Sequence, residues 1–109
     1  MTSRLSTDTL AQLTPLLGRL ARLVARGSQL SDAQLHTLLI GADLESDPAV
    51  LEELRRWRRL LTALWEQPSE ENRQATVEAL LLRGLPKASV FLAVATVVDH
   101  LGEAAPSVS

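Results

Sequence analysis

The sequence contains no cysteine and no tyrosine, and its aromatic residues are one phenylalanine and two tryptophans. The lack of cysteine excludes disulfides, zinc sites built from thiolates and thiol nucleophiles, and it fits a reducing compartment. Hydrophobic residues make up 46% of the chain but aromatics only 3%, so that leucine supplies most of the candidate core. This composition favours helices packed on helices over β-sheets, and we expect an all-α protein.

Long hydrophobic runs are also missing. The longest nearly apolar run covers residues 88–98, well short of the roughly 18 residues that would indicate a membrane span. The first residues, MTSRLSTDT, lack the basic and then apolar pattern of a secretion signal. We therefore expect a cytoplasmic protein with no membrane-spanning helix.

The chain has little net charge, formally −2 at neutral pH. A protein with this balance has no overall field that attracts phosphate backbones, so binding to nucleic acid would require a local basic patch. The 109 residues correspond to one domain. We expect a single helical domain over residues 7–102, between a disordered start at 1–6 and a disordered tail at 103–109.

Helix start and stop signals divide the chain into about five helical segments. A polar cap followed by proline recurs as a start signal, glycine recurs as a stop signal, and one start has the Ser-x-x-Gln pattern of a capping box. The predicted starts are Thr14-Pro15, Ser31 with Gln34, Asp47-Pro48, Ser69 and Leu85-Pro86, and the predicted ends are Gly27, Gly41, Gln67-Pro68, Arg83-Gly84 and Leu101-Gly102. The pattern predicts a compact bundle of about five helices.

The first segment allows two interpretations. Leu10 and Leu13 precede the Thr14-Pro15 signal, and they indicate either a short preceding turn or one helix that is kinked at Pro15.

The last segment, KASVFLAVATVVDHL, contains several β-branched residues that would also suit a strand. A strand needs a partner to satisfy its backbone hydrogen bonds, and the chain offers no second strand. We therefore predict a helix over Val90–Val98. Because this helix is apolar nearly all round, we expect it to be central and surrounded by the others.

The stretch ELRRWRRLLTALW, residues 53–65, places four arginines around one tryptophan. At 100° per residue, Trp57 falls on the apolar side of a helix, away from most of the arginines. Glu52 and Glu53 precede Arg55, Arg56 and Trp57 by three or four residues and can balance part of the basic charge along the helix surface. The apolar side, which we expect to face the core, carries Val50, Leu54, Trp57, Leu61, Leu64 and Trp65.

Two arginine stripes are the candidate binding residues. The first lies on an early helix with the spacing i, i+3, i+7, and the second follows the polar side of the helix that contains Trp57. These stripes could contact an acidic protein partner, could bind nucleic acid, or could only be solvated faces. The candidate partner-binding residues are Arg19, Arg22, Arg26, Arg55, Arg56 and Arg59.

The residues that carry enzyme chemistry are sparse. His36 shares a helix face with Asp32, and His100 lies three residues before Glu103, so each pair could supply two metal ligands. A helical di-metal site normally needs repeated Glu-x-x-His elements and further inward carboxylates, and nothing in this sequence repeats. There is no glycine-rich phosphate loop and no nucleophile motif. We expect no catalytic residues, no metal site and no cofactor.

One segment carries a family resemblance. Trp65 precedes a Pro68-Ser69 cap, an acidic first turn with Asn72 and Arg73, and an alanine- and leucine-rich helix that is followed by another apolar helix. In these features residues 65–95 resemble an uncharacterised family of small bacterial helical proteins, some of which accompany contractile secretion systems. The resemblance implies a small accessory protein, and it implies no catalytic residues.

These observations lead to three functional hypotheses. The first is a non-enzymatic protein–protein interaction module, which is an adaptor, a chaperone or an assembly subunit and whose protein partner could be acidic. The second is a nucleic-acid-binding subunit that uses the patch from Arg55 to Arg59. The third is a small metal-binding protein or enzyme that uses His36 or His100. The oligomeric state does not follow from the sequence.

Overall fold

Five α-helices follow one another along the chain in the computed structural model, which describes residues 6–27, 30–44 and 47–104, the last five of these by their backbone alone. No strand occurs within these residues, and the all-α prediction is confirmed. The helices are α1 (Thr7–Ala25), α2 (Asp32–Gly41), α3 (Pro48–Glu66), α4 (Glu70–Leu82) and α5 (Lys87–Ala104).

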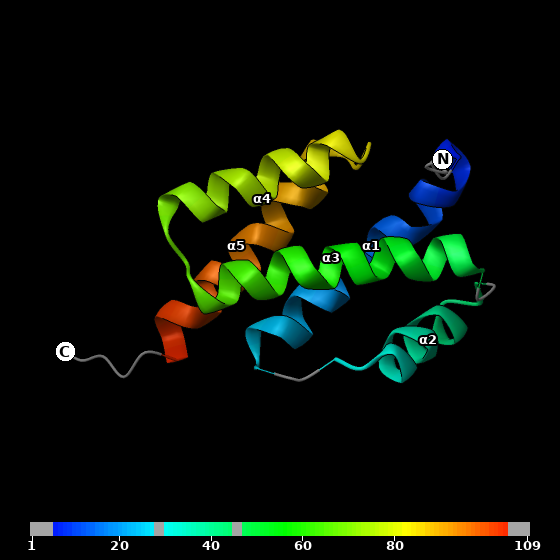
Figure 1. Ribbon diagram of the computed structural model, residues 1–109, viewed down its shortest axis with the longest axis horizontal. Coiled ribbons are helices and arrows are strands. Elements are labelled where there is room, and N and C mark those ends of the chain that lie inside the picture. Colours follow the sequence, from blue (N-terminus) through cyan, green and yellow to red (C-terminus); the bar gives the residue numbers. More distant parts are fainter. Residues whose placement is uncertain (1–5, 28–29, 45–46, 105–109) are drawn as a thin grey trace.

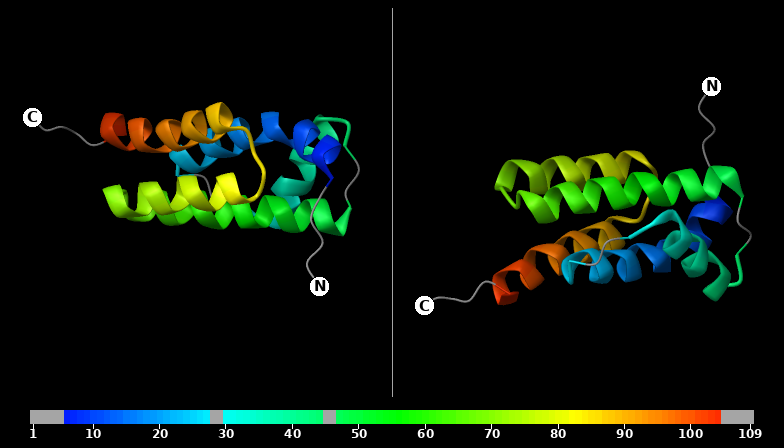
Figure 2. Two further views of the ribbon diagram at one scale, coloured as in Figure 1. Left: turned by 90° about the horizontal axis from the view of Figure 1, so that it is seen from above. Right: turned by 60° about the horizontal axis from the view of Figure 1, so that its bottom comes forward.

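The helices form two layers. Helices α3 and α4 lie side by side as an antiparallel pair, and α1 and α5 form the second layer, in which both run in roughly the same direction (Figures 1 and 2). The short helix α2 lies at the edge, against α3 near the start of that helix (Figure 1). No helix among the described residues is long and apolar enough to cross a membrane.

The core is built almost entirely from leucine, valine and alanine, with Trp57 as its largest side chain. Trp57 is fully buried, which confirms the prediction that the apolar side of α3 faces the core, and α3 packs against each of the other four helices. Burying a side chain of this size removes a large apolar area from water and contributes strongly to stability. Of the six residues predicted to face the core, Trp65 is only partly buried, and the buried ones are Val50, Leu54, Trp57, Leu61 and Leu64.

The segment Val90–Val98 is helical, as predicted. Helix α5 packs against α1, α3 and α4, which fits its predicted central place. One side of the helix is nevertheless open to solvent, because a two-layer arrangement covers a helix on its inner side only. Phe91 is 50% exposed and Leu92 is 67% exposed, whereas Val90, Val94 and Val97 are buried.

Most predicted helix ends are confirmed. The Ser31 hydroxyl accepts a hydrogen bond from the backbone N–H of Gln34 at 3.3 Å, and the Gln34 side chain accepts one from the backbone N–H of Ser31 at 2.9 Å, which completes the capping box. Asp47 and Ser69 cap α3 and α4. Gly27 and Gly84 have φ angles of 77° and 93°, which glycine adopts without steric cost, and they follow the ends of α1 and α4.

The predicted start of the first helix at Thr14-Pro15 is wrong. Helix α1 begins at Thr7, where the Ser6 hydroxyl accepts a hydrogen bond from the backbone N–H of Thr9, and Pro15 lies inside the helix. The Thr14 hydroxyl donates to the Leu10 carbonyl at 2.7 Å instead of capping a helix. Of the two interpretations of this segment, a single helix is therefore observed. The packing of leucines on both sides of Pro15 compensates for the backbone hydrogen bond that proline cannot make.

Two further ends differ in detail. Gly41 is the last residue of α2, and the chain reverses at Asp43, whose φ of 60° lies in the left-handed region that aspartate tolerates better than most residues. Helix α5 continues to Ala104, beyond the predicted end near Leu101-Gly102. The segments predicted to be disordered fall mainly on residues 1–5 and 105–109, which lie outside the described residues.

Candidate functional site

The outer face of α1 carries three exposed arginines, Arg19, Arg22 and Arg26. The spacing i, i+3, i+7 places them along one side of the helix, because 3.6 residues complete each turn. The opposite side of α1 carries Leu17 and Leu20, which are fully buried in the core. The amphipathic pattern of this helix therefore fixes the arginines toward solvent.

A shallow groove of about 270 Å³ lies between this face and α2. Its apolar part consists of Leu23 from α1 and Leu38 from α2, both of which are only partly buried. We call this depression the α1–α2 groove, and its lining residues are Arg19, Arg22, Leu23, Arg26 and Leu38. The three arginines were predicted from the sequence but Leu38 was not, since its place beside them depends on the packing of α2.

The three arginines of the groove form no ion pair with any residue in the described part of the chain. Four other arginines do form ion pairs with carboxylates: Arg55, Arg58, Arg73 and Arg83. The groove is therefore a local positive surface on a chain whose net charge is slightly negative.

Helix α2 is held in place by an ion-pair cluster around Asp32. Arg55 Nη2 donates to Asp32 Oδ2 at 2.9 Å, and Arg58 Nη1 donates to Asp32 Oδ1 at 3.0 Å. Arg58 Nη1 also donates to the Leu30 carbonyl oxygen at 2.9 Å, just before α2 begins. Hydrogen bonds from Arg55 and Arg58 lower the pKa of Asp32, and the hydrogen bond to Asp32 raises the pKa of Arg55. This cluster fixes the wall of the groove that contributes Leu38.

The second arginine stripe does not form a continuous surface. Arg55 is hydrogen-bonded to Asp32 and also donates to Glu52 at 3.1 Å. Arg56 is partly buried, and its Nε atom is buried without a hydrogen-bond partner among the described residues. Arg59 is exposed and lines a different depression from that of the first stripe. The structure therefore does not place the two stripes along one groove.

Glu53 differs most from its expected place. Glu53 was predicted to lie on the surface of the helix, yet it is only 3% exposed. Its Oε2 atom accepts hydrogen bonds from Trp57 Nε1 at 2.9 Å and from Arg83 Nε at 3.0 Å, and its Oε1 atom accepts one from Arg83 Nη2 at 2.5 Å. The hydrogen bonds to Glu53 raise the pKa of Arg83. The spacing of four residues between Glu53 and Trp57 was a usable signal, but Arg83 lies thirty residues away along the chain.

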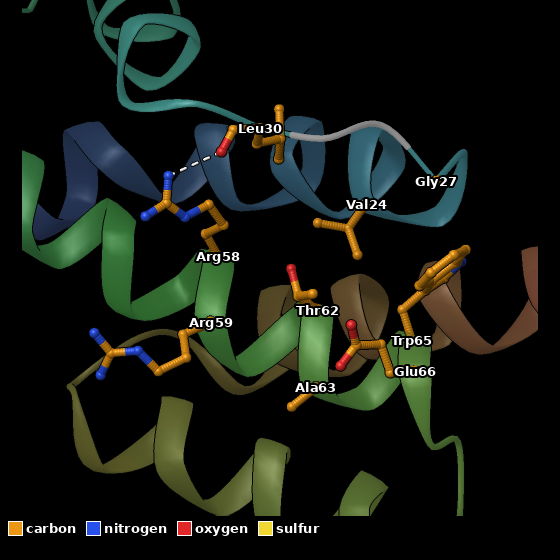
Figure 3. A pocket seen from close by; sticks show the side chains of 9 residues that line it. All are labelled: Val24, Gly27, Leu30, Arg58, Arg59, Thr62, Ala63, Trp65 and Glu66. Atoms are coloured by element: carbon orange, nitrogen blue, oxygen red, sulfur yellow. Dashed lines mark hydrogen bonds between the residues drawn. The ribbon is translucent and has the colours of Figure 1, made fainter.

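A depression of about 600 Å³ lies between the end of α1 and the second half of α3 (Figure 3). Its polar side chains do not converge on one point. Figure 3 shows Arg58 directed toward the Leu30 carbonyl, to which it is hydrogen-bonded, and Arg59 directed away from Trp65. Trp65 lies beside Gly27, where an added Cβ atom would meet its ring at 3.4 Å. The depression therefore lacks the convergent polar groups that orient a small ligand.

The candidate metal ligands do not gather into a site among the described residues. Asp32 is bound by two arginines, and His36 on the same helix is exposed. Within the described residues, no group of three or more His, Asp or Glu side chains could hold a metal ion. The side chain of His100 lies outside this part of the chain.

Comparisons with protein-family models, curated proteins and solved structures give no match for this chain. The resemblance of residues 65–95 to the family of small bacterial proteins stays a prediction. A functional proposal must therefore rest on the surfaces described above.

Proposed function

We propose that this protein is a non-enzymatic, cytoplasmic protein-binding module, which acts as an adaptor, a chaperone or an assembly subunit. The partner docks in the α1–α2 groove. The observation that carries the proposal is the position of three exposed arginines, without acidic partners among the described residues, around the partly buried Leu23 and Leu38.

The charge arrangement favours an acidic partner because like charges are adjacent on α1, and the C-terminal end of α1, where Arg22 and Arg26 lie, offsets only part of their repulsion. Arg22 and Arg26 are separated by four residues and Arg19 and Arg22 by three, so each pair of like charges is adjacent on the helix surface and destabilises the helix by a few tenths of a kcal/mol. Elsewhere the chain places carboxylates next to its arginines, as Asp32 does for Arg55. A partner that supplies negative charge would remove this repulsion and would be attracted over a longer range.

Nucleic acid is the alternative partner. The residues that suggested it, Trp57 and Arg55, form contacts within the protein. Trp57 is fully buried and hydrogen-bonded to Glu53, so its ring cannot stack on a base. Arg55 is paired with Asp32 and Glu52. The remaining exposed arginines could still contact phosphate, and the experiment below distinguishes the two partners.

The resemblance of residues 65–95 extends the proposal. These residues cover the end of α3, all of α4 and the first half of α5, and none of them lines the α1–α2 groove. We propose that the shared segment supplies the scaffold of a secretion-associated accessory protein and that α1 and α2 supply its individual binding surface.

The proposal is tested by site-specific photocrosslinking in the native cell. A photoreactive amino acid replaces Leu23 in the groove, and the matched control replaces Gln74, which is exposed on α4. We expect a discrete protein adduct from position 23, none from position 74, and loss of the adduct when Arg22→Glu is added. The same protein adducts from both positions, or adducts to nucleic acid from position 23, would reject the proposal.

A further inference from the structure

We infer that the partner presents an acidic amphipathic helix to the α1–α2 groove, with carboxylates paired to Arg19, Arg22 and Arg26 and one apolar side chain seated between Leu23 and Leu38. This inference rests on the proposed function, since it specifies the chemistry of the partner for the same groove.

The spacing of the arginines favours a helical partner. Arg19 and Arg26 are separated by seven residues, or about 10 Å along the axis of α1. A second helix that lies along α1 repeats this spacing with carboxylates at i, i+3 and i+7 on one face. Helices that bind in grooves use these same positions as anchors. The partner helix can therefore match all three arginines without distortion.

The type of cation favours carboxylates. The groove contains arginine and no lysine, and the planar guanidinium group donates two parallel hydrogen bonds to a carboxylate. The three side chains are exposed, so the partner can approach them directly. Phosphate groups would satisfy the guanidinium groups equally well, and charge alone does not distinguish the two anions.

The apolar part of the groove distinguishes a peptide from a polynucleotide. Leu23 and Leu38 come from different helices, line the same groove as the arginines and are only partly buried. A leucine-like side chain of a partner helix would complete their burial, and burying apolar area stabilises a complex. A phosphate backbone gains nothing from this apolar contact. The combination therefore fits an acidic helix with one apolar anchor better than it fits nucleic acid.

The groove is preformed in the free protein. Leu38 belongs to α2, and Asp32 at the start of α2 is held by Arg55 and Arg58. Leu38 also packs against the hydrophobic core, and the chain neighbours of the two leucines, Leu39 and Val24, are buried. A preformed site loses less conformational entropy on binding than a mobile one.

The experiment measures binding of the full chain to synthetic peptides by fluorescence anisotropy. The probe is an alanine-based helical peptide of about 20 residues, long enough for measurable helicity, with glutamates at i, i+3 and i+7 and a leucine at i+4. Two control peptides replace the three glutamates by glutamine or the leucine by asparagine. We expect both replacements to weaken binding several-fold and added salt to weaken binding of the glutamate peptide.

Two protein variants with the same change in net charge locate the site. Arg22→Glu lies in the groove, and Arg59→Glu is a control on α3 at a residue that is also exposed. We expect Arg22→Glu to weaken binding of the glutamate peptide several-fold and Arg59→Glu to leave it nearly unchanged. Circular dichroism should show the same helicity for both variants, because neither side chain is buried.

Three results would overturn the inference. The glutamate and glutamine peptides could bind equally, the two arginine variants could weaken binding equally, or a single-stranded oligonucleotide or an anionic lipid vesicle could bind more tightly than the peptide in a manner that depends on Arg22. If the peptide fails while position 23 still crosslinks to a protein, the acidic-helix inference fails and the proposed function stands. If both experiments fail, both proposals fail.

Discussion

The indole nitrogen of Trp57 donates a hydrogen bond of 2.9 Å to the carboxylate of Glu53, one turn earlier on α3, and both residues are buried. A charged carboxylate is costly to bury unless it is hydrogen-bonded and paired with a cation. Arg83 supplies that cation from the end of α4 and donates two further hydrogen bonds. This network joins α3 to the C-terminal end of α4, next to the leucine core.

Two substitutions of Trp57 should distinguish the stability that comes from its packing from the stability that comes from its hydrogen bond. Trp57→Ala should lower the free energy of unfolding by about 3–5 kcal/mol, because it removes a fully buried aromatic side chain. Trp57→Phe keeps most of the apolar bulk but leaves Glu53 with one donor fewer, and it should cost about 1–3 kcal/mol. Urea denaturation measures both. A loss below 1 kcal/mol for Trp57→Ala would contradict the burial of this residue.

Removing one member of the buried Glu53–Arg83 ion pair should lower the free energy of unfolding more than replacing both members by leucine. Arg83→Leu leaves the Glu53 carboxylate without its cation and should cost on the order of 2–3 kcal/mol, somewhat below the range for fully buried pairs, since the Arg83 side chain is 23% exposed. Adding Glu53→Leu to this variant should recover much of the stability, because no buried charge remains. Denaturation of the single and double variants tests the coupling. Additive losses would show that the two side chains do not interact.

The capping box should contribute to stability and not to binding. Ser31→Ala removes the acceptor of the Gln34 N–H and should lower the free energy of unfolding by about 0.5–2 kcal/mol. Binding of the acidic peptide should be unchanged, because Ser31 does not line the α1–α2 groove. Ser69→Ala removes the equivalent cap of α4 and serves as the matched control. Weaker peptide binding with unchanged stability in Ser31→Ala would mean that this hydroxyl contacts the partner.

The ion pairs of Asp32 should appear in the pH dependence of stability. Arg55 and Arg58 lower the pKa of Asp32 in the folded protein below the usual value of about 3.9. Between the folded and unfolded pKa values the unfolded chain binds more protons, so stability rises with pH there. The contribution is complete above about pH 4 and is lost as the pH falls through the lowered pKa of the folded state.

Asp32→Asn tests this assignment. The variant should be less stable than the parent protein at neutral pH, and the difference should shrink as the pH falls below about 4. Asp8→Asn is a suitable control, since Asp8 is exposed in the first turn of α1 and forms no ion pair with the described residues. Urea denaturation over a series of pH values provides the measurement. A stability difference that is independent of pH would exclude the proposed ion pairs.

Local signals were sufficient for most helix boundaries. The Ser31 capping box, the Asp47 and Ser69 caps and the glycines after α1 and α4 act over four residues or fewer, so their hydrogen bonds can be inferred from adjacent sequence. Pro15 shows the limit of this reasoning. The dipeptide Thr14-Pro15 is a valid start signal, but the leucines on both sides of it pack into one core and the helix continues through it.

The sequence alone determined the helical class, the buried side of α3 and the outward direction of Arg19, Arg22 and Arg26, because each follows from the period of the α-helix. Only the tertiary structure decided which charged residues remain available. Asp32 reaches Arg55 and Arg58 across more than twenty residues, Glu53 reaches Arg83 across thirty, and Leu38 joins the arginines of α1 in one groove. These contacts depend on how the helices pack against one another. The helical period of one segment contains no information about which other helix of the chain packs against it.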